Sequence, residues 1–241
     1  MKRYRLNILA AIAVIAVILL PSCRFGCVHG SGNQVSEMRK VAGFTKIDVS
    51  GAFKIILKQD SSSTVNISTD DNLLKYVNTE VSGDKLRIST RGKNICTNGP
   101  ILITIGIHHL GEIKSSGAVE VESAGKLITG DLSFKLSGIT KVNMELDAAH
   151  VSTESSGSAE INLKGQASSH SVDLNGGGKI HAFDFVVGNY TIETSGASDC
   201  EINVLHQLNV NSSGASSIKY KGNPTSVNSD KSGISSITKV N

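Results

Sequence analysis

Short stretches in which apolar and polar residues alternate follow one another from about residue 39 to the end of the chain. Strict alternation is typical of β-strands that bury one face. The strands that this pattern predicts in the first half of the chain lie at residues 44–50, 52–59, 64–69 and 100–107.

Two segments between these strands have a different pattern. Residues 80–90 predict a hairpin, because the Gly-Asp pair at 83–84 separates two alternating runs. Residues 71–77 predict one short helical turn, with Asp70 or Asp71 as its cap.

From residue 111 onward the pattern becomes periodic. A Ser-Gly or Asn-Gly pair returns in steps of 21, 19, 19, 20, 18 and 19 residues, counted from glycine to glycine, and an apolar residue stands four places after each glycine. An earlier copy of the motif lies at residues 50–55. The glycines of the eight copies are Gly51, Gly117, Gly138, Gly157, Gly176, Gly196, Gly214 and Gly233.

A period of about 19 residues without a helical pattern predicts a β-solenoid, in which each repeat forms one coil. We interpret the glycines as corner residues, because a sharp corner needs a residue that accepts a positive φ or a close backbone approach. Equivalent apolar residues would then stack in columns inside the coils. The alternative is an up-and-down antiparallel sheet with regular turns, but such hairpins would not need a repeat that matches in every copy.

The N-terminus has the layout of a bacterial export signal. Three basic residues among the first five precede an apolar run over residues 8–20, which is short for a permanent membrane span. Residues 20–23, Leu-Pro-Ser-Cys, resemble the lipobox of bacterial lipoproteins, although Pro21 departs from its usual pattern. The resemblance implies cleavage before Cys23 and acylation of that cysteine; the alternative is a soluble secreted protein with a chance cysteine.

Removal of this signal changes the charge. The formal net charge of +3 comes entirely from Lys2, Arg3 and Arg5, and the remaining chain has 21 basic and 21 acidic residues. A neutral chain lacks the basic excess that drives counterion release from nucleic acid. We therefore expect no binding to nucleic acid, and contact with a membrane only through the N-terminal lipid.

These features divide the chain into a lipoprotein signal peptide at 1–22, a flexible tether at 23–38, a β-rich part at 39–110 and the Ser-Gly repeat β-helix at 111–241. With Cys23 acylated, three cysteines remain, so Cys27, Cys96 and Cys200 could form one disulfide whose partners the spacing leaves open. Cys200 stands where other repeats have Ile or Val, which predicts a small buried apolar residue.

Several segments carry a family resemblance. Residues 41–55 (VAGFTKIDVSGAFKI), 71–77 (DNLLKYV) and 218–224 (IKYKGNP), together with the Ser-Gly-Ala copies, resemble the head GIN domain family. Members of that family are Bacteroidota envelope proteins that are labelled auto-transporter adhesins and are also listed as a domain of unknown function. The resemblance spans residues 39–239 and implies a right-handed parallel β-helix.

The sequence departs from the family's pattern in two places. Residues 107–110 (Ile-His-His-Leu) stand where a proline-containing connection is usual, and residues 176–178 (Gly-Gly-Gly) replace Ser-Gly-Ala. Both departures are expected to alter a corner and to leave the fold intact.

No residue pattern points to catalysis, a metal or a cofactor. The seven histidines lack metal-ligand spacing and are expected at the surface or at strand edges. Glu120, Glu160, Asp199 and Glu201 fall near one place in their coils, but Lys141 and Lys179 occupy equivalent places. This mixture of signs predicts a solvated face instead of a calcium or catalytic site.

The aromatic residues do not predict a sugar-stacking groove. The chain has no Trp, and its phenylalanines from Phe44 on lie in alternating strands, where they are expected in the core. Tyr76, Tyr190 and Tyr220 could be exposed but form no row.

Two functions are consistent with this sequence. The first is a non-catalytic adhesin or structural module of the cell envelope, whose rigid β-faces meet a protein or glycan partner. The second is a β-helix protein that binds or cleaves polysaccharides. The absence of an acidic cluster after Cys23 favours an outer-membrane anchor that faces the periplasm over surface exposure. Open coil ends can pair with another copy, so a homo-oligomer is compatible with the sequence.

Overall fold

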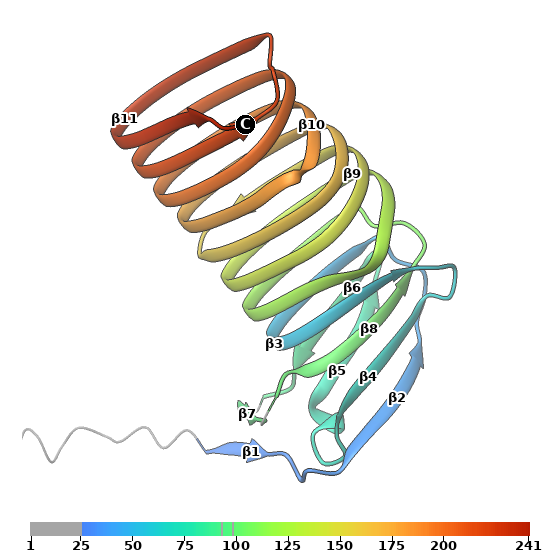
Figure 1. The fold of residues 1–241 in the computed structure, drawn as a ribbon. Coiled ribbons are helices and arrows are strands. Elements are labelled where there is room, and N and C mark those ends of the chain that lie inside the picture. Colours follow the sequence, from blue (N-terminus) through green and yellow to red (C-terminus); the bar gives the residue numbers. More distant parts are fainter. Residues whose placement is uncertain (1–25, 93, 98) are drawn as a thin grey trace, which may run out of the picture.

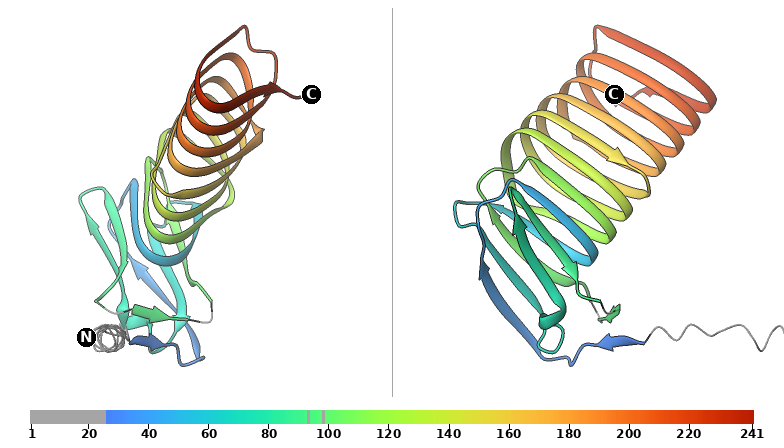
Figure 2. Two further views of the ribbon diagram at one scale, coloured as in Figure 1. Left: turned by 90° about the vertical axis from the view of Figure 1, so that its left-hand side faces the viewer. Right: turned by 180° about the vertical axis from the view of Figure 1, so that it is seen from behind.

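The structure is a computed structural model that describes residues 26–92, 94–97 and 99–241. Within these residues the regular secondary structure is β-strand apart from one 3₁₀ turn, so the all-β prediction is confirmed. Figures 1 and 2 show a stack of coils that rises from a group of separate strands, with the C-terminus at the far end of the stack. We call residues 26–110 the N-terminal region and residues 111–241 the coil region.

Three very long strands make up the coil region: β9 (Glu112–Ser155), β10 (Ser158–Lys221) and β11 (Ser226–Lys239). They pair in parallel with partners about one repeat away, so that Ile161 lies beside Val142 and Ile218 lies beside Ile237. The antiparallel alternative is therefore wrong for this region. Each strand is long because the chain bends at every corner without losing its pairing to the next coil (Figure 1).

The repeat glycines form one column along the stack. An ideal Cβ on Gly138 would lie 2.4 Å from the carbonyl oxygen of Gly117, and a Cβ on Gly157 would lie 2.2 Å from that of Gly138. Gly138 also has a φ of +87°, a conformation that side chains disfavour. The same close approach to the preceding glycine recurs at Gly117, Gly176, Gly196, Gly214 and Gly233.

Around each corner, residues an even number of places from the glycine point inward and those an odd number point outward. The column four places after the glycine is buried in every coil but the last, where Ile237 is half-buried; Val142, Ile161 and Cys200 are each at most 1% exposed. The prediction for Cys200 is confirmed, and burial raises the pKa of its thiol to about 12. This column supplies much of the apolar burial that holds neighbouring coils together.

The Gly-Gly-Gly segment has a packing explanation. A Cβ on Gly178 would lie 2.8 Å from Cδ1 of Leu174, which occupies the facing interior position of the same coil. Leu174 is 1% exposed. The missing side chain of Gly178 therefore provides the space that Leu174 fills, and the coil continues in register.

Nine shorter elements lie in the N-terminal region: β1 (Cys27–His29), β2 (Gln34–Lys40), β3 (Lys46–Gln59), β4 (Thr64–Asp70), η1 (Leu74–Tyr76), β5 (Val77–Ser82), β6 (Lys85–Thr90), β7 (Asn94–Cys96) and β8 (Ile101–Ile107). The central strand β3 pairs in parallel with β9 on one edge and with β6 and β8 on the other. Antiparallel pairs join β2 to β4, β4 to β8, and β5 to β6. The predicted hairpin at 80–90 corresponds to β5 and β6, with Gly83 at a φ of +61°.

Two details of the N-terminal region differ from the sequence prediction. Residues 44–50 and 52–59 are one strand, because β3 runs through Gly51 without a break. The short helical turn exists as η1, but neither Asp70 nor Asp71 caps it. Leu73 is its N-cap, and no side chain supplies a capping hydrogen bond.

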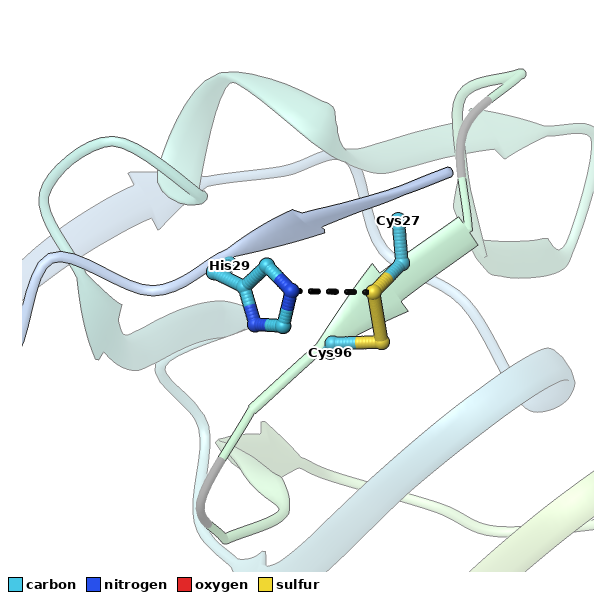
Figure 3. Close-up of a disulfide and its surroundings, with 3 residues drawn as sticks. All are labelled: Cys27, His29 and Cys96. Atoms are coloured by element: carbon cyan, nitrogen blue, oxygen red, sulfur yellow. Dashed lines mark hydrogen bonds between the residues drawn. A yellow bond between two sulfur atoms is a disulfide. The ribbon is translucent and has the colours of Figure 1, made fainter. Parts of the chain in front are cut away.

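The flexible tether predicted over 23–38 is wrong for its described residues. β1 pairs in parallel with β7, and β2 pairs with β4 along its whole length. A disulfide joins Cys27 to Cys96, and His29 lies beside it (Figure 3). The side chains of Asp70 and Asp71 hold the same segment, because Gln34 donates a hydrogen bond to Asp70, and Ser31 and Asn33 donate to Asp71 at 2.6 and 3.0 Å.

The last coil ends the stack with polar residues. Ser212 is buried in the preceding coil, but the residue that pairs with it in the last coil is Lys231. In the same register Lys239 pairs with Tyr220. Both lysines are exposed in the outermost coil. Charged residues at interior-type positions of an edge strand oppose the addition of a further strand.

Candidate functional site

The outward side chains of the strand that follows each corner make one charged surface. We call it the charged face; it consists of the residues three, five and seven places after each repeat glycine. Its first column carries alternating charges along the coils, in the order Lys54, Glu120, Lys141, Glu160, Lys179 and Asp199.

Ion pairs follow from this alternation. The ammonium of Lys54 lies 3.7 Å from Glu120 and 3.0 Å from Glu122, and that of Lys141 lies 3.1 Å from Glu160. Hydrogen bonding from Lys54 lowers the pKa of Glu122, and hydrogen bonding from Lys141 lowers the pKa of Glu160. The carboxylates are thus separated by cations, and the structure does not bring Glu120 and Glu160 together.

The second column of the charged face is mainly uncharged in its middle. Asn162 donates a hydrogen bond from Nδ2 to Oδ1 of Asn143 at 2.7 Å. Nδ1 of His181 lies 3.1 Å from a carboxylate oxygen of Glu201, and the ammonium of Lys219 lies 3.3 Å from the other. These contacts lower the pKa of Glu201, with the hydrogen bond from His181 as the main cause.

A groove crosses five coils on this face, and we call it the coil groove. Its volume is about 460 Å³, within the usual range of small-ligand sites. The side chains that define its rim are Asn143, Glu145, Asn162, Lys164, His181, Phe183, Asp184 and Glu201, and Ser123 and Gly125 close one end.

Phe183 corrects the prediction that the phenylalanines lie in the core. Phe44, Phe53, Phe134 and Phe185 are buried, but Phe183 is half-buried and lines the coil groove. The ammonium of Lys221 lies 4.8 Å from the centre of its ring. Phe183 and Asp184 both point outward, so a corner interrupts the alternation and places Phe183 and Phe185 on opposite sides of the wall.

His170 and Tyr190 correct two further predictions. His170 is 1% exposed and Tyr190 is 0% exposed, so neither belongs to the surface. Nε2 of His170 lies 2.9 Å from the hydroxyl of Thr153, and Nδ1 lies 3.2 Å from that of Tyr190. Burial lowers the pKa of His170 to about 3, so the imidazole is neutral. Both residues lie an even number of places before a repeat glycine, which was a usable signal for an interior position.

The strand before each corner carries an acidic column that the sequence analysis missed. Glu154, Asp173 and Glu193 follow one another on adjacent coils, three places before Gly157, Gly176 and Gly196. No ion pair of these three carboxylates occurs within the described residues. Those residues also contain no group of three or more His, Cys, Asp or Glu side chains arranged to hold a metal.

A second groove of about 600 Å³ runs along the corner itself. Small residues form most of it, including Gly177, Ala197 and Ala215, and Ile139, which is 70% exposed, stands at one end. The predicted lipid attachment site, Cys23, lies outside the described residues. None of the helical structure that is described could span a bilayer.

A family model described as "Putative auto-transporter adhesin, head GIN domain" matches residues 43–224. The chain belongs to this family. The resemblance noted from the sequence is thus confirmed, and the head GIN domain includes both the coil groove and most of the N-terminal region.

Solved structures share the fold. A "putative adhesin" from Bacteroides fragilis is similar with a TM-score of 0.82 and 23% identity, over 88% of this chain and 100% of that chain. A "putative adhesin" from Parabacteroides merdae has a TM-score of 0.61 and 22% identity, over 89% of this chain and 99% of that one. A protein from Parabacteroides distasonis titled "Putative lipid binding protein" has a TM-score of 0.60 and 21% identity, with the same coverage. No curated protein matches the chain.

Proposed function

We propose that this head GIN domain protein is a non-catalytic lipoprotein adhesin of the bacterial cell envelope. Acylated Cys23 anchors it to the outer membrane, and the coils form a right-handed parallel β-helix that holds a partner-binding face away from the lipid. The family description and the adhesin titles of its structural neighbours support this proposal.

The coil groove carries the proposal. Each of its five coils is held by parallel pairing and by an apolar interior, so side chains from residues 123 to 201 keep fixed spacings across the groove. Rigid elements of this kind position binding groups better than loops do. Since Lys54 and Lys141 separate the carboxylates of the first column, the face suits recognition of a partner rather than acid–base chemistry.

Two measurements test this function with the full chain. Charge reversal on the groove rim, Lys164→Glu with Glu145→Lys, should abolish capture of the protein's partner when bacteria or coated beads adhere to glycan-coated surfaces. The matched control reverses the acidic column instead, with Glu154→Lys and Glu193→Lys, and should keep adhesion.

The second measurement concerns the anchor and the absence of catalysis. Cys23→Ala should release the protein from the membrane fraction and prevent incorporation of labelled fatty acid. Saturable turnover of a uronic-acid or mucin glycan, lost on mutation of Glu120 or Glu160, would overturn the proposal in favour of a polysaccharide-active protein.

A further inference from the structure

The hydrogen bonds of the second column stop in the middle of the coil groove. On one side Asn162 donates to Asn143, and on the other side His181 and Lys219 both contact Glu201. No hydrogen bond within the described residues joins Asn162 to His181, although they stand five places after glycines of adjacent coils. The chain of hydrogen bonds along the column is therefore interrupted between Asn162 and His181.

Four polar groups around this break have no partner among the described residues. They are Oδ1 of Asn162, Nε2 of His181, the ammonium of Lys164 and the carboxylate of Asp184. Together they offer acceptors and donors within one concave surface, and all four residues line the groove. A few convergent polar groups in a pocket are the usual mark of a small-ligand site.

Phe183 adds an aromatic wall next to the break. Lys221 contacts its ring but does not line the groove, whereas Phe183 itself does. A ring that borders a polar groove can receive the C–H face of a sugar, which is the apolar side of an otherwise hydroxyl-rich ligand.

The groove does not resemble a protein-binding hot spot. Its apolar lining residues Met144 and Leu163 are 4% and 1% exposed, so they offer almost no surface to a partner side chain. Trp, Tyr and Arg dominate the energetics of protein interfaces, and none of the described residues that line the groove is of these types. The groove also carries both acidic and basic groups, so its charge does not favour a charged polymer.

We infer that the coil groove binds a neutral oligosaccharide, whose sugar rings lie across the coils and whose hydroxyls bridge Asn162 and His181 while one ring stacks on Phe183. Sugar hydroxyls both donate and accept hydrogen bonds, as the four open groups require. Five coils at the usual strand spacing of about 4.8 Å give a groove roughly 19 Å long, enough for several sugar rings. This inference rests on the proposed adhesin function and names the ligand class for it.

The test uses the full mature protein and a panel of neutral linear oligosaccharides: maltohexaose, cellohexaose, mannohexaose and chitohexaose. Binding is followed by titration calorimetry and by saturation-transfer NMR. At least one oligosaccharide should bind saturably, and Phe183→Ala and Asn162→Ala should each weaken it about tenfold or more, because each removes one ring contact or hydrogen-bonding group. Phe183→Leu should fail to restore binding, since it keeps apolar volume without a ring.

Asn209→Ala is the matched control, because Asn209 likewise shares a side-chain hydrogen bond with an asparagine one coil away, accepting it from Asn228, but lies outside the groove. It should leave affinity unchanged, and all variants should keep the same unfolding midpoint. Absence of binding across the panel, equal binding by Phe183→Ala, or displacement of the sugar by peptides would overturn the inference. Adhesion without oligosaccharide binding would contradict this inference but not the adhesin function. Turnover of a bound sugar would contradict the non-catalytic function, while the sugar site itself would stand.

Discussion

The coil region and the N-terminal region hold a β-core together in different ways. In the coil region each residue pairs with its equivalent one coil away, so the same contacts recur from Gly117 to Gly233. In the N-terminal region β3 pairs with three different strands, and antiparallel strand pairs and one disulfide link the remaining segments. Stability in the first region comes from repetition, and in the second from single contacts between distant segments.

A substitution in the glycine column should have the largest effect, because it breaks the repetition itself. Gly138→Ala puts a Cβ 2.4 Å from the carbonyl oxygen of Gly117 at a φ of +87°. We expect it to lower the free energy of unfolding by at least about 4 kcal/mol, measured by denaturant unfolding.

Gly177→Ala is the matched control for this prediction. Gly177 also lies at a corner, but a Cβ there meets nothing within 4 Å. Its substitution should change stability by less than about 0.5 kcal/mol. Equal losses for both variants would show that the corners need glycine for a reason other than close stacking.

The two regions also differ in how far their structure could be predicted. The coils were predictable because period, corner glycine and core position repeat in every copy, so one error does not shift the others. The pairing of β3 with β6, β8 and β9 has no local sequence mark, because it depends on which segments meet in space. The disulfide partners were left open for the same reason.

The candidate site lies between these two cases. Its first column was predictable, since Glu120, Lys141 and Glu160 follow directly from the repeat. The groove was not, because Phe183 faces outward only where a corner interrupts the alternation. Alternation alone would place Phe183 and Phe185 on the same side.

Removal of the disulfide should weaken the N-terminal region and spare the coils. Cys27 and Cys96 are 69 residues apart, so their link restricts a long loop of the unfolded chain. In the double variant Cys27→Ala and Cys96→Ala we expect a loss of about 3 kcal/mol. Hydrogen exchange should become faster in β1, β2 and β7, while β10 and β11 keep their protection.

Cys200→Val serves as its control, because it removes a cysteine from the coil interior and installs the residue that two other repeats have there, Val121 and Val142. It should cost less than about 1 kcal/mol. Faster exchange throughout the coil region in the double variant would mean that the two regions unfold together, and the contrast between them would not hold.

An effect that appears only in acid concerns His170, a polar exception inside the apolar coils. Thr153, Tyr190 and Phe185 surround its ring, and burial lowers its pKa from 6.5 to about 3. The unfolded chain therefore binds a proton that the folded chain does not, between these two pH values. Stability from this residue is fully present above about pH 6.5 and falls by about 1.4 kcal/mol per pH unit as the pH drops toward 3.

His170→Gln should remove this part of the acid sensitivity, because glutamine does not titrate, while its amide can still meet the hydroxyls of Thr153 and Tyr190. Unfolding curves between pH 7 and pH 4 measure the difference in slope between the variant and the original protein. The control is His150→Gln, since His150 is exposed and its Nδ1 lies 2.8 Å from the hydroxyl of Ser169. If the original protein, His170→Gln and His150→Gln all lose stability in parallel, the imidazole of His170 is not held neutral by burial.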